Sequence, residues 1–501
     1  MTFPATDGIT DRLQALFAYD ASSPLIFSSG LFLFLFAGFL LVYSAFRRAP
    51  MARIVYVIAF SLYFYYKSSG IYFLLLVFAA ASDFLIARGI YRARFRWTKR
   101  WLVVLSVAVN LGMLGYFKYT NFLIDISNQL FGQGFLQFQN IFLPVGISFF
   151  VFQSMSYTID IYRGQLKPLS NWLDYLFYLS FFPQLVAGPI VRARDFIPQI
   201  RQNPVVVTRE MFGTGVFLIL TGLFKKAIIS DYISLNFVDR IFDEPLLYSG
   251  FECLMGIYGY ALQIYCDFSG YSDMAIGIAL LLGFRFPKNF DAPYKSATIT
   301  EFWRRWHISL STWLRDYLYI SLGGNRKGRI RTYGNLLLTM LLGGLWHGAA
   351  VRFILWGGLH GAALALHKLW LSVVPGAKVS GYQMHPLSRL AGILVTFHLV
   401  CFGWLLFRAD SMRTVQLMLH QITDNFHLQL LPQMLAGYGG VFALVGLGYL
   451  LHMLPGRADA AARRAVVASP FWVQVLLLAS VAWGVMQIQS SSIQPFIYFQ
   501  F

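Results

Sequence analysis

The chain has 501 residues, of which 57% are apolar and only 12% are charged, and its net charge is +18. Soluble globular proteins carry roughly 25% charged residues, so this composition excludes an ordinary soluble fold and predicts a membrane protein. The apolar runs described next predict an all-α polytopic one. Disorder is excluded because it requires low hydrophobicity, whereas the chain contains 48 Phe, 28 Tyr and 12 Trp. Excess Lys and Arg are typical of cytoplasmic loops of membrane proteins, so the positive charge predicts a membrane topology and not nucleic-acid binding.

The predicted membrane helices begin with an apolar run at residues 24–46, which is too long for the core of a cleavable signal peptide. A spanning helix needs roughly 20 residues. Because several later runs are shorter or interrupted by Gly, Pro or charge, we expect about eleven to thirteen membrane helices, some of them half-length or re-entrant. The later runs lie at residues 51–66, 69–87, 101–117, 140–157, 173–190, 211–230, 250–283, 333–350, 353–374, 390–407, 436–455 and 470–488.

Loop charges predict the orientation of the first helices. Residues 1–23 contain three Asp and one Arg, whereas the loop after the first run carries Arg47, Arg48 and Arg53. Two runs later, residues 88–100 contain six basic residues and no acidic residue. The positive-inside rule places both basic loops in the cytoplasm, so the N-terminus is expected on the extracytoplasmic side.

A second basic zone, residues 285–331, contains ten basic and three acidic residues. Within it, residues 301–319 repeat apolar and aromatic side chains every three or four positions, which is typical of one face of a helix. Aromatic rings together with arginines favour the membrane–water boundary, so we expect an amphipathic interfacial helix on the cytoplasmic side. The side chains of this face are Trp303, Trp306, Leu310, Trp313, Leu314 and Tyr317.

Histidines inside apolar runs are the first candidates for chemistry, because polar residues in a membrane are costly and are often functional. His347 lies in a stretch without charge from residue 335 to 350, and a neutral imidazole can accept a proton near pH 7. The alternative is a histidine that donates to a backbone carbonyl at a helix break. His307 is the second candidate, whereas His360, His367, His398 and His452 are predicted to be structural.

No metal site or disulfide is predicted. The three cysteines, Cys253, Cys266 and Cys401, lie far apart in apolar stretches, and the sequence contains no CxxC or HExxH motif.

Two carboxylates in one apolar run form a further candidate. Asp267 and Asp273 lie within residues 250–283, and Gly270 between them predicts a helix break. They could relay protons, but the favoured interpretation is that they cap the broken helix and bind nearby Arg. Residues 143–148 and 181–189 carry similar break signals, and irregular backbone in a membrane must be buried in protein or line a cavity. The sequence therefore predicts an internal tunnel, with candidate lining residues Trp303, Arg304, Arg305, Trp346, Asp267, Ser269, Asp273 and Gln153.

Five segments together resemble the membrane-bound O-acyltransferase family, in particular its bacterial polysaccharide branch, from about residue 25 to residue 501. They are Phe182-Pro-Gln-Leu-Val-Ala-Gly-Pro189, Tyr265-Cys-Asp-Phe-Ser-Gly-Tyr-Ser-Asp273, Glu301-Phe-Trp-Arg-Arg-Trp-His-Ile-Ser-Leu310, Gly344-Leu-Trp-His-Gly348 and Pro495-Phe-Ile-Tyr-Phe-Gln-Phe501. The resemblance implies a ring of helices around a thin floor that is crossed by a tunnel. It also implies that His347 matches the family's most nearly invariant histidine and His307 its second polar position.

The resemblance further implies acetyl transfer from a cytoplasmic thioester donor such as acetyl-CoA, with no bound cofactor. The expected acceptor is an exported polysaccharide, with alginate first and cellulose or peptidoglycan next. Extracytoplasmic partner proteins and a bacterial inner-membrane location are expected as well. His347 would act as general base, and His307 would orient the donor or stabilise the oxyanion.

Arg304, Arg305 and Arg326 could bind the phosphates of such a donor, although positive-inside bias explains the same charges. One membrane domain over residues 1–501 is expected, with N-terminal spans at 24–117, an acyltransferase core at 140–407 and C-terminal spans at 436–501. Two alternatives are D-alanyl transfer to teichoic acid and a polysaccharide or lipid transporter. Transporters often contain paired repeats, and the sequence contains none that we recognise.

Overall fold

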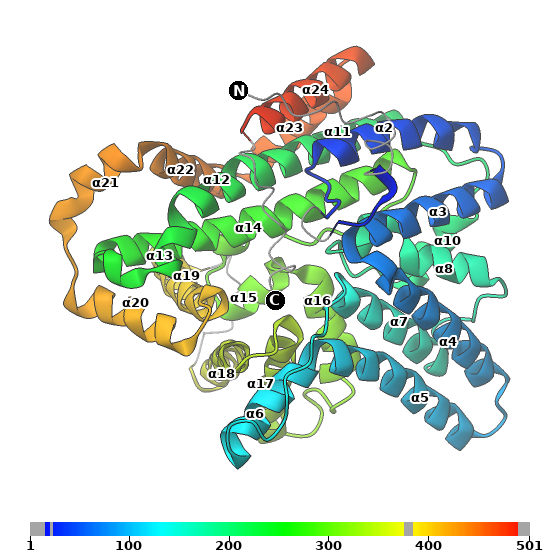
Figure 1. The fold of residues 1–501 in the computed structure, drawn as a ribbon, viewed down its shortest axis with the longest axis horizontal. Coiled ribbons are helices and arrows are strands. Elements are labelled where there is room, and N and C mark those ends of the chain that lie inside the picture. Colours follow the sequence, from blue (N-terminus) through cyan, green and yellow to red (C-terminus); the bar gives the residue numbers. More distant parts are fainter. Residues whose placement is uncertain (1–15, 21–23, 375–383, 489–501) are drawn as a thin grey trace.

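The computed structural model describes residues 16–20, 24–374 and 384–488, and the regular secondary structure of these residues is helical throughout. One long helix, α14 (Gly250–Leu281), runs through the middle of the molecule with the other helices around it (Figure 1). The all-helical fold predicted from the apolar runs and the family resemblance is therefore confirmed for these residues. The motif at residues 495–501, and Asp7 and Asp11 of the acidic N-terminal segment, lie outside the described ranges.

The helices of the first two hundred residues lie mostly on the right of Figure 1 and extend into its lower part. Local signals define where several of these helices begin. Ser29 accepts a hydrogen bond from the N–H of Phe32 at the start of the first, and Pro50 occupies the first turn of the second, where its missing N–H costs no hydrogen bond. The helices of this part are α2 (Gly30–Ala45), α3 (Pro50–Ser69), α4 (Phe73–Arg92), α5 (Arg96–Leu114), α6 (Thr120–Phe131), α7 (Ile147–Tyr162), α8 (Trp172–Ser180), α9 (Phe182–Leu185) and α10 (Ala193–Ile200).

The rest of the chain supplies the left side of the molecule, its top and a share of its lower part in Figure 1. Its helices are α11 (Arg209–Leu223), α12 (Asp231–Ile233), α13 (Asp239–Asp243), α15 (Ile299–Arg305), α16 (Ile308–Trp313), α17 (Arg329–His347), α18 (Val351–Val373), α19 (Pro386–Arg408), α20 (Met412–Asp424), α21 (Leu431–Gly437), α22 (Gly439–Met453), α23 (Gly456–Ala468) and α24 (Phe471–Ile488).

Short π-helical segments interrupt several helices. They are η2 (Gly115–Tyr119), η3 (Phe224–Ser230), η4 (Ser234–Val238) and η7 (Leu314–Tyr319). A π turn inserts an extra residue and re-aims side chains, and such turns are frequent at functional sites. In this chain η2 carries Lys118 and η3 carries Lys225 and Lys226, so two of these turns coincide with lysines that enter apolar helices.

Four helical segments in the described residues are long and apolar enough to cross a membrane: Pro50–Arg92, Arg96–Phe131, Arg209–Asp243 and Pro386–Arg408. Two bent helix pairs, α21 with α22 and α23 with α24, raise the number to six if each pair is one span. The first apolar run forms α2, which has only 16 residues. The membrane character is therefore confirmed, whereas the count of eleven to thirteen membrane helices stays a prediction.

Helices α11 and α14 cross through paired glycines. A Cβ atom at Gly222 would lie 2.6 Å from the carbonyl oxygen of Gly270, and one at Gly270 would lie 2.8 Å from that of Gly222. Gly215 and Gly277 form a second such pair, at 2.9 and 2.6 Å. The predicted helix break at Gly270 is therefore wrong, because α14 is continuous there and the glycine allows the two backbones to approach.

The other two predicted breaks are confirmed. Residues 132–146 are not helical, and α7 begins after Gly146, whose φ of +76° is a left-handed conformation. A Cβ at Gly146 would also collide with the carbonyl oxygen of Leu185, so glycine is required there for two reasons. That carbonyl belongs to the second break, where α9 has only four residues and an irregular buried segment follows it. The two breaks therefore pack against each other.

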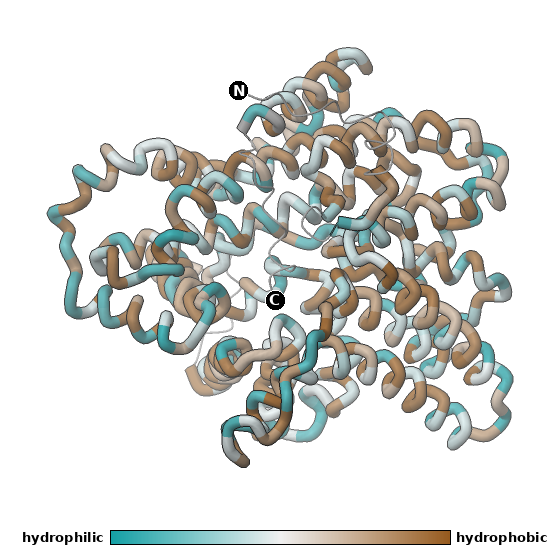
Figure 2. Tube along the Cα trace, in the orientation of Figure 1, coloured by the Kyte–Doolittle hydropathy of each residue, from teal (hydrophilic) through white to brown (hydrophobic). Residues whose placement is uncertain are grey.

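Hydrophobic residues cover the outer as well as the inner sides of the helices (Figure 2). Large apolar side chains such as Phe34, Leu85 and Leu130 are more than two-thirds exposed. A soluble protein rarely exposes so large an apolar surface, so the outer surface of the helices is suited to lipid.

Candidate active site

His347 is the last residue of α17 and is buried, with 3% of its surface exposed. The next residue, Gly348, lies against the ring of Phe353, with which any Cβ at this position would collide. The end of α17 is therefore held close to the start of α18. This packing fixes the direction in which the His347 side chain leaves the helix.

The last carbonyl groups of α17 are satisfied from another part of the chain. The Lys118 ammonium donates to the carbonyl oxygens of Trp346 and His347, both at 2.8 Å, and the Tyr119 hydroxyl donates to that of Leu345 at 2.6 Å. Carbonyls at a helix C-terminus have no partner within the helix and favour a nearby cation. The segment η2 thus provides the cap of the helix that carries His347.

His307 lies between α15 and α16, fully buried, in a left-handed conformation with a φ of +43°. Its ring packs edge-on against that of Phe268 of α14, with 4.6 Å between the ring centres. The ring centres of Phe149 and Phe290 lie within 6.4 Å of that of His307. The predicted interfacial helix over residues 301–319 is therefore wrong in two respects: the chain turns at His307, and the aromatic face is buried in the protein. The exposed fractions of its side chains are 8% or less for Trp303, Trp306, Leu310, Trp313, Leu314 and Tyr317.

Asn289, a buried loop residue that follows α14, holds His307. Its side-chain oxygen Oδ1 lies 3.3 Å from Nδ1 of His307 and accepts from the Ser309 backbone N–H at 3.1 Å and hydroxyl at 2.9 Å. The Asn289 amide nitrogen donates to the Ser272 hydroxyl at 3.1 Å. His307 Nε2 makes no hydrogen bond to any residue that the structure describes.

The two candidate histidines meet at Trp346. The ring centre of this tryptophan lies 6.2 Å from that of His307 and 4.9 Å from that of His347. Its indole N–H donates to the carbonyl oxygen of Ser148, at the start of α7, at 3.1 Å. Two residues separated by forty positions, and predicted from different motifs, are thus brought to one buried aromatic cluster.

Gln153 of α7 faces the same region. It lies one turn after Phe149, whose ring contacts Trp346 at 5.2 Å as well as His307. Gln153 is 1% exposed, and among the described residues neither atom of its amide has a hydrogen-bond partner. An unsatisfied buried amide costs free energy, so the position is suited to a polar group of a ligand.

His360 of α18 is a third histidine of this cluster, although the sequence indicated only a structural role for it. Its ring lies 4.7 Å from that of Trp356 and 5.2 Å from that of Trp303, and Trp356 in turn contacts His347 at 5.0 Å. His360 is fully buried, and neither ring nitrogen is hydrogen-bonded within the described part of the chain.

The carboxylates of α14 form ion pairs. Lys226 of η3 pairs with Asp267 at 2.7 Å and with Asp231 at 2.8 Å, and Lys225 pairs with Asp273 at 2.6 Å. The expected arginine partners are therefore wrong, since both partners are lysines, and a cap of a broken helix is wrong because α14 is unbroken. Buried carboxylates require such partners, so Asp267 and Asp273 join α14 to η3 while the neighbouring Phe268 and Ser272 contact the histidine site.

The predicted phosphate-binding arginines differ in their surroundings. Arg305 is bound to Glu301 at 2.9 Å and to Asp291 at 3.6 Å, whereas Arg304 and Arg326 are exposed. Burial would raise the pKa of Asp291, but the Lys288 ammonium that donates to it, with Arg305 and Lys295, lowers that pKa below its usual value. Asp291 therefore stays ionised at neutral pH, and Arg305 is held in a structural ion pair.

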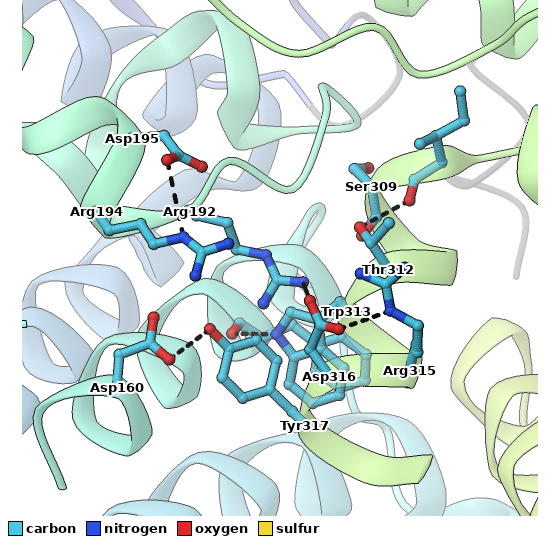
Figure 3. Close-up of polar contacts among 12 residues, drawn as sticks. Asp160, Arg192, Arg194, Asp195, Ser309, Thr312, Trp313, Arg315, Asp316 and Tyr317 are labelled. Atoms are coloured by element: carbon cyan, nitrogen blue, oxygen red, sulfur yellow. Dashed lines mark hydrogen bonds and ion pairs between the residues drawn. The ribbon is translucent and has the colours of Figure 1, made fainter. Parts of the chain in front are cut away.

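A second group of arginines surrounds η7 (Figure 3). The Tyr317 hydroxyl donates to Asp160 of α7 at 2.8 Å, and the guanidinium of Arg192 lies over the Tyr317 ring at 4.4 Å and pairs with Asp316 at 3.3 Å. Nearby, the Trp313 indole N–H donates to the carbonyl oxygen of Phe152 at 3.0 Å. These contacts fix η7 and α16 against α7, and with them the backbone that carries His307 and Ser309.

A metal centre is not formed in the described residues, where no group of three or more His, Cys, Asp or Glu could hold a metal ion. The three cysteines, all of which are described, are buried and free. The aromatic cluster around Trp346 contains the imidazoles of His307 and His347, with that of His360 close by, in a buried environment. Such groups can accept protons or orient a substrate.

A sequence model described as the membrane-bound O-acyltransferase family matches residues 127–405, which is more than half of the chain. The chain belongs to the membrane-bound O-acyltransferase family. Both candidate histidines and the whole of α14 lie within the matched part. Membership in this family makes the protein an O-acyltransferase.

Three relatives of this O-acyltransferase bear on its reaction. The probable alginate O-acetylase AlgI of Pseudomonas putida is 38% identical, covering 95% of this chain and 100% of the relative. The peptidoglycan O-acetyltransferase of Helicobacter pylori is 36% identical over 78% of each chain. The teichoic acid D-alanyltransferase of Bacillus subtilis is 30% identical and covers 54% of this chain and 69% of the relative.

The sequence pointed to both candidate histidines that the fold brings to Trp346, but it did not single out Lys118 or Asn289, and it predicted only a structural role for His360. Lys225 and Lys226 lie inside the run at 211–230, and Lys118 directly follows the run at 101–117. These lysines could have been found, because a lysine in or beside an apolar run implies a buried partner. Asn289 lies in a polar loop segment that carries no motif, so its role follows only from the fold.

Proposed function

We propose that this O-acyltransferase transfers an acetyl group from a cytoplasmic thioester such as acetyl-CoA for the O-acetylation of an exported polysaccharide, with alginate as the leading acceptor. The observation that carries this proposal is the meeting of buried His307 and His347 at Trp346 in a chain similar to an alginate O-acetylase along nearly its whole length. Cellulose and peptidoglycan are the next acceptors, and the similarity to a peptidoglycan O-acetyltransferase favours the latter.

In the proposed reaction His347 acts as the general base. An acceptor hydroxyl attacks the thioester carbonyl carbon while His347 takes the hydroxyl proton. The new C–O bond forms, the C–S bond breaks, and the imidazolium returns the proton to the departing thiolate, so that a free thiol and an ester are produced. A positioned base of this kind contributes about 10² to 10⁴-fold in rate, and the surrounding aromatic rings exclude water that would hydrolyse the thioester.

The proposed topology connects this reaction to export. The protein lies in the bacterial inner membrane as one membrane domain, with its N-terminus outside and with Arg47, Arg48 and the basic segment at residues 88–100 inside. Arg53, which was expected in the same loop, is instead buried in α3 and donates to the carbonyl oxygens of Ile200 and Gln202. The donor reaches the site from the cytoplasm, and extracytoplasmic partner proteins receive or place the acetyl group. Exposed Arg304 and Arg326 remain candidates for the donor phosphates, and Gln153, Trp303 and Trp346 are the proposed lining of the substrate path.

The decisive experiment compares the His347→Ala variant with the wild type in cells that lack the native protein. The acetyl-ester content of the secreted polysaccharide is measured at matched amounts of protein in the membrane. We expect ester content to fall by at least the factor of about 10² that a general base provides, while the yield of polymer stays unchanged. The matched control is His398→Ala, which removes an exposed histidine of α19 and should leave ester content as in the wild type.

Unchanged ester content in His347→Ala would contradict the proposed role of His347. Loss of polymer export with the ester content of the residual polymer intact would favour a transporter. D-alanyl transfer is the second candidate function, because the teichoic acid D-alanyltransferase is similar over about half of this chain. It predicts activity with an aminoacylated carrier protein and none with acetyl-CoA.

A further inference from the structure

The orientation of the Asn289 side chain is determined by its neighbours. Its Oδ1 atom faces the backbone N–H of Ser309 at 3.1 Å, and its Nδ2 atom faces the Ser272 hydroxyl at 3.1 Å. A backbone N–H can only donate a hydrogen bond, so the atom opposite it must be the amide oxygen. The reversed amide would place two donors against each other.

This orientation determines which nitrogen of His307 carries the proton. Nδ1 of His307 lies 3.3 Å from the same Oδ1 atom, which can only accept. A neutral imidazole has one N–H and one lone pair, and two lone pairs facing each other at this distance would repel. The Ser309 hydroxyl lies 3.5 Å from Nδ1 but donates its one proton to Oδ1 at 2.9 Å, so Nδ1 carries the proton and Nε2 the lone pair.

The backbone fixes this pair in place. The N–H of Ile308 donates to the Asn289 carbonyl oxygen at 2.9 Å, and the Ser309 hydroxyl receives a hydrogen bond from the N–H of Ile190 at 3.0 Å. The contacts hold His307 in its left-handed conformation, which costs a non-glycine residue free energy. An uncommon backbone conformation retained by several specific hydrogen bonds is a sign of a constrained functional position.

We propose that Asn289 is a positioning residue that holds His307 as the Nδ1–H tautomer, so that His307 Nε2 accepts a hydrogen bond from an N–H or O–H group of the substrate. The inference rests on the proposed acyl-transfer function and refines it. A neutral His307 in this tautomer has no proton at Nε2 to donate to an oxyanion, so it orients a substrate group that donates. That group is an amide N–H of the thioester donor or a hydroxyl of the saccharide, and both share this chemistry.

His307 is surrounded by few groups that can change charge with it. Asp267 and Asp273 are paired with lysines, Asp160 is bound by Tyr317, and Asp291 is bound by Lys288 and Arg305. His347 is the remaining imidazole on an element packed against it. The ionisable side chains on these elements are Arg329, Arg331, Tyr333 and His347 on α17; Glu252, Cys253, Tyr258, Tyr260, Tyr265, Cys266, Asp267, Tyr271 and Asp273 on α14; Tyr157, Asp160 and Tyr162 on α7; Glu301, Arg304 and Arg305 on α15; and Arg285, Lys288, Asp291, Tyr294 and Lys295 between α14 and α15.

Two substitutions at Asn289 test the proposal. Asn289→Asp keeps an oxygen that accepts from Nδ1–H and from Ser309, whereas Asn289→Leu has nearly the same size but no acceptor. We expect Asn289→Leu to lower kcat/KM by about tenfold to a hundredfold, as misplacement of a reacting group does, and Asn289→Asp to keep most of the activity at alkaline pH. The matched control is Asn128→Leu, because Asn128 of α6 is also buried and makes two hydrogen bonds, to the backbone of Leu136.

The pH profile separates a positioning role from a merely structural one. A carboxylate beside Nδ1 favours the protonated imidazole, in which Nε2 carries a proton and cannot accept. Asn289→Asp should therefore lose activity at a higher pH than the wild type as the pH falls, whereas Asn128→Leu should show the wild-type profile. The assay measures transfer from acetyl-CoA to alginate oligosaccharides in membrane vesicles that contain the protein, with ester content in cells as a parallel readout.

The Michaelis constants identify the group that Nε2 accepts. In Asn289→Leu an increase in KM for acetyl-CoA indicates the thioester donor, and an increase in KM for the oligosaccharide indicates the acceptor hydroxyl. Equal losses in Asn289→Asp and Asn289→Leu with an unmoved pH profile, or wild-type kcat/KM in Asn289→Leu, would overturn the proposal. If His347→Ala is inactive in the same assay, such a result rejects the positioning role alone. If His347→Ala is fully active, the proposed function itself fails.

Discussion

The rings of His307 and His347 approach one tryptophan along different backbone routes. His347 is placed by the end of a helix whose carbonyls are capped by Lys118 and Tyr119, and His307 is placed by a left-handed residue held by Asn289. In each case the candidate side chain lies at an irregular point of the backbone. A polar group from another part of the chain then binds the backbone or ring atoms that have no partner nearby. The site therefore depends on single residues outside the two motifs that made it recognisable.

Gly348→Ala is a direct test of this dependence. The added Cβ would collide with the ring of Phe353, and overpacking of this kind costs about 1–3 kcal/mol. We expect a lower melting temperature in detergent and a loss of ester content larger than the loss of protein, because the displaced backbone carries His347. Gly446→Ala on α22 is the control, since a Cβ there meets no atom within 4 Å. A Gly348→Ala protein as stable and active as this control would show that the helix end tolerates displacement.

At the scale of elements, the boundaries of several helices could be predicted from the sequence, but their partners could not. The run at 353–374 corresponds to α18 and that at 390–407 to the larger part of α19, because the length of an apolar segment can be read from the sequence. Gly270 illustrates what the sequence could not decide. A glycine in an apolar run is equally consistent with a break in the helix and with close packing of two helices, and the structure shows close packing. His307 is a second example. Apolar side chains recur every three or four residues on both sides of His307, so the pattern predicted one continuous helix, whereas the chain turns there.

The crossing of α14 with α11 and η3 also predicts which ion pair matters for stability. The side chains of Lys226 and Asp267 are 3% and 4% exposed, whereas those of Lys225 and Asp273 are 26% and 22% exposed. Removing one partner of a buried pair costs about 3–5 kcal/mol because a buried charge is left behind. Lys226→Met should therefore lower the melting temperature more than Lys225→Met, and Asp267→Asn should restore part of the loss in Lys226→Met. The order of the melting temperatures in one detergent checks this, and equal values for the two lysine variants would contradict it.

At the scale of the whole molecule, the orientation in the membrane decides whether a cytoplasmic thioester can reach the site. Arg94 lies in the short loop between α4 and α5, and Gln137 lies in the loop between α6 and α7, at the opposite end of the candidate span Arg96–Phe131. Because the predicted N-terminus is extracytoplasmic, Arg94 should face the cytoplasm and Gln137 the outside. Both positions are exposed, and the three native cysteines are at most 3% exposed, so introduced cysteines can be labelled over a low background.

A membrane-impermeant maleimide applied to spheroplasts should label Gln137→Cys and spare Arg94→Cys, which should react only after lysis. The physical reason is the distribution of charge, with six basic and no acidic residues between positions 88 and 100, which holds that loop on the cytoplasmic side during insertion. The variants keep the site intact, so their ester content serves as a control for correct folding. Labelling of Arg94→Cys in intact spheroplasts would show that the topology is the reverse of the predicted one. The basic loops would then face the outside, where a cytoplasmic thioester does not reach them.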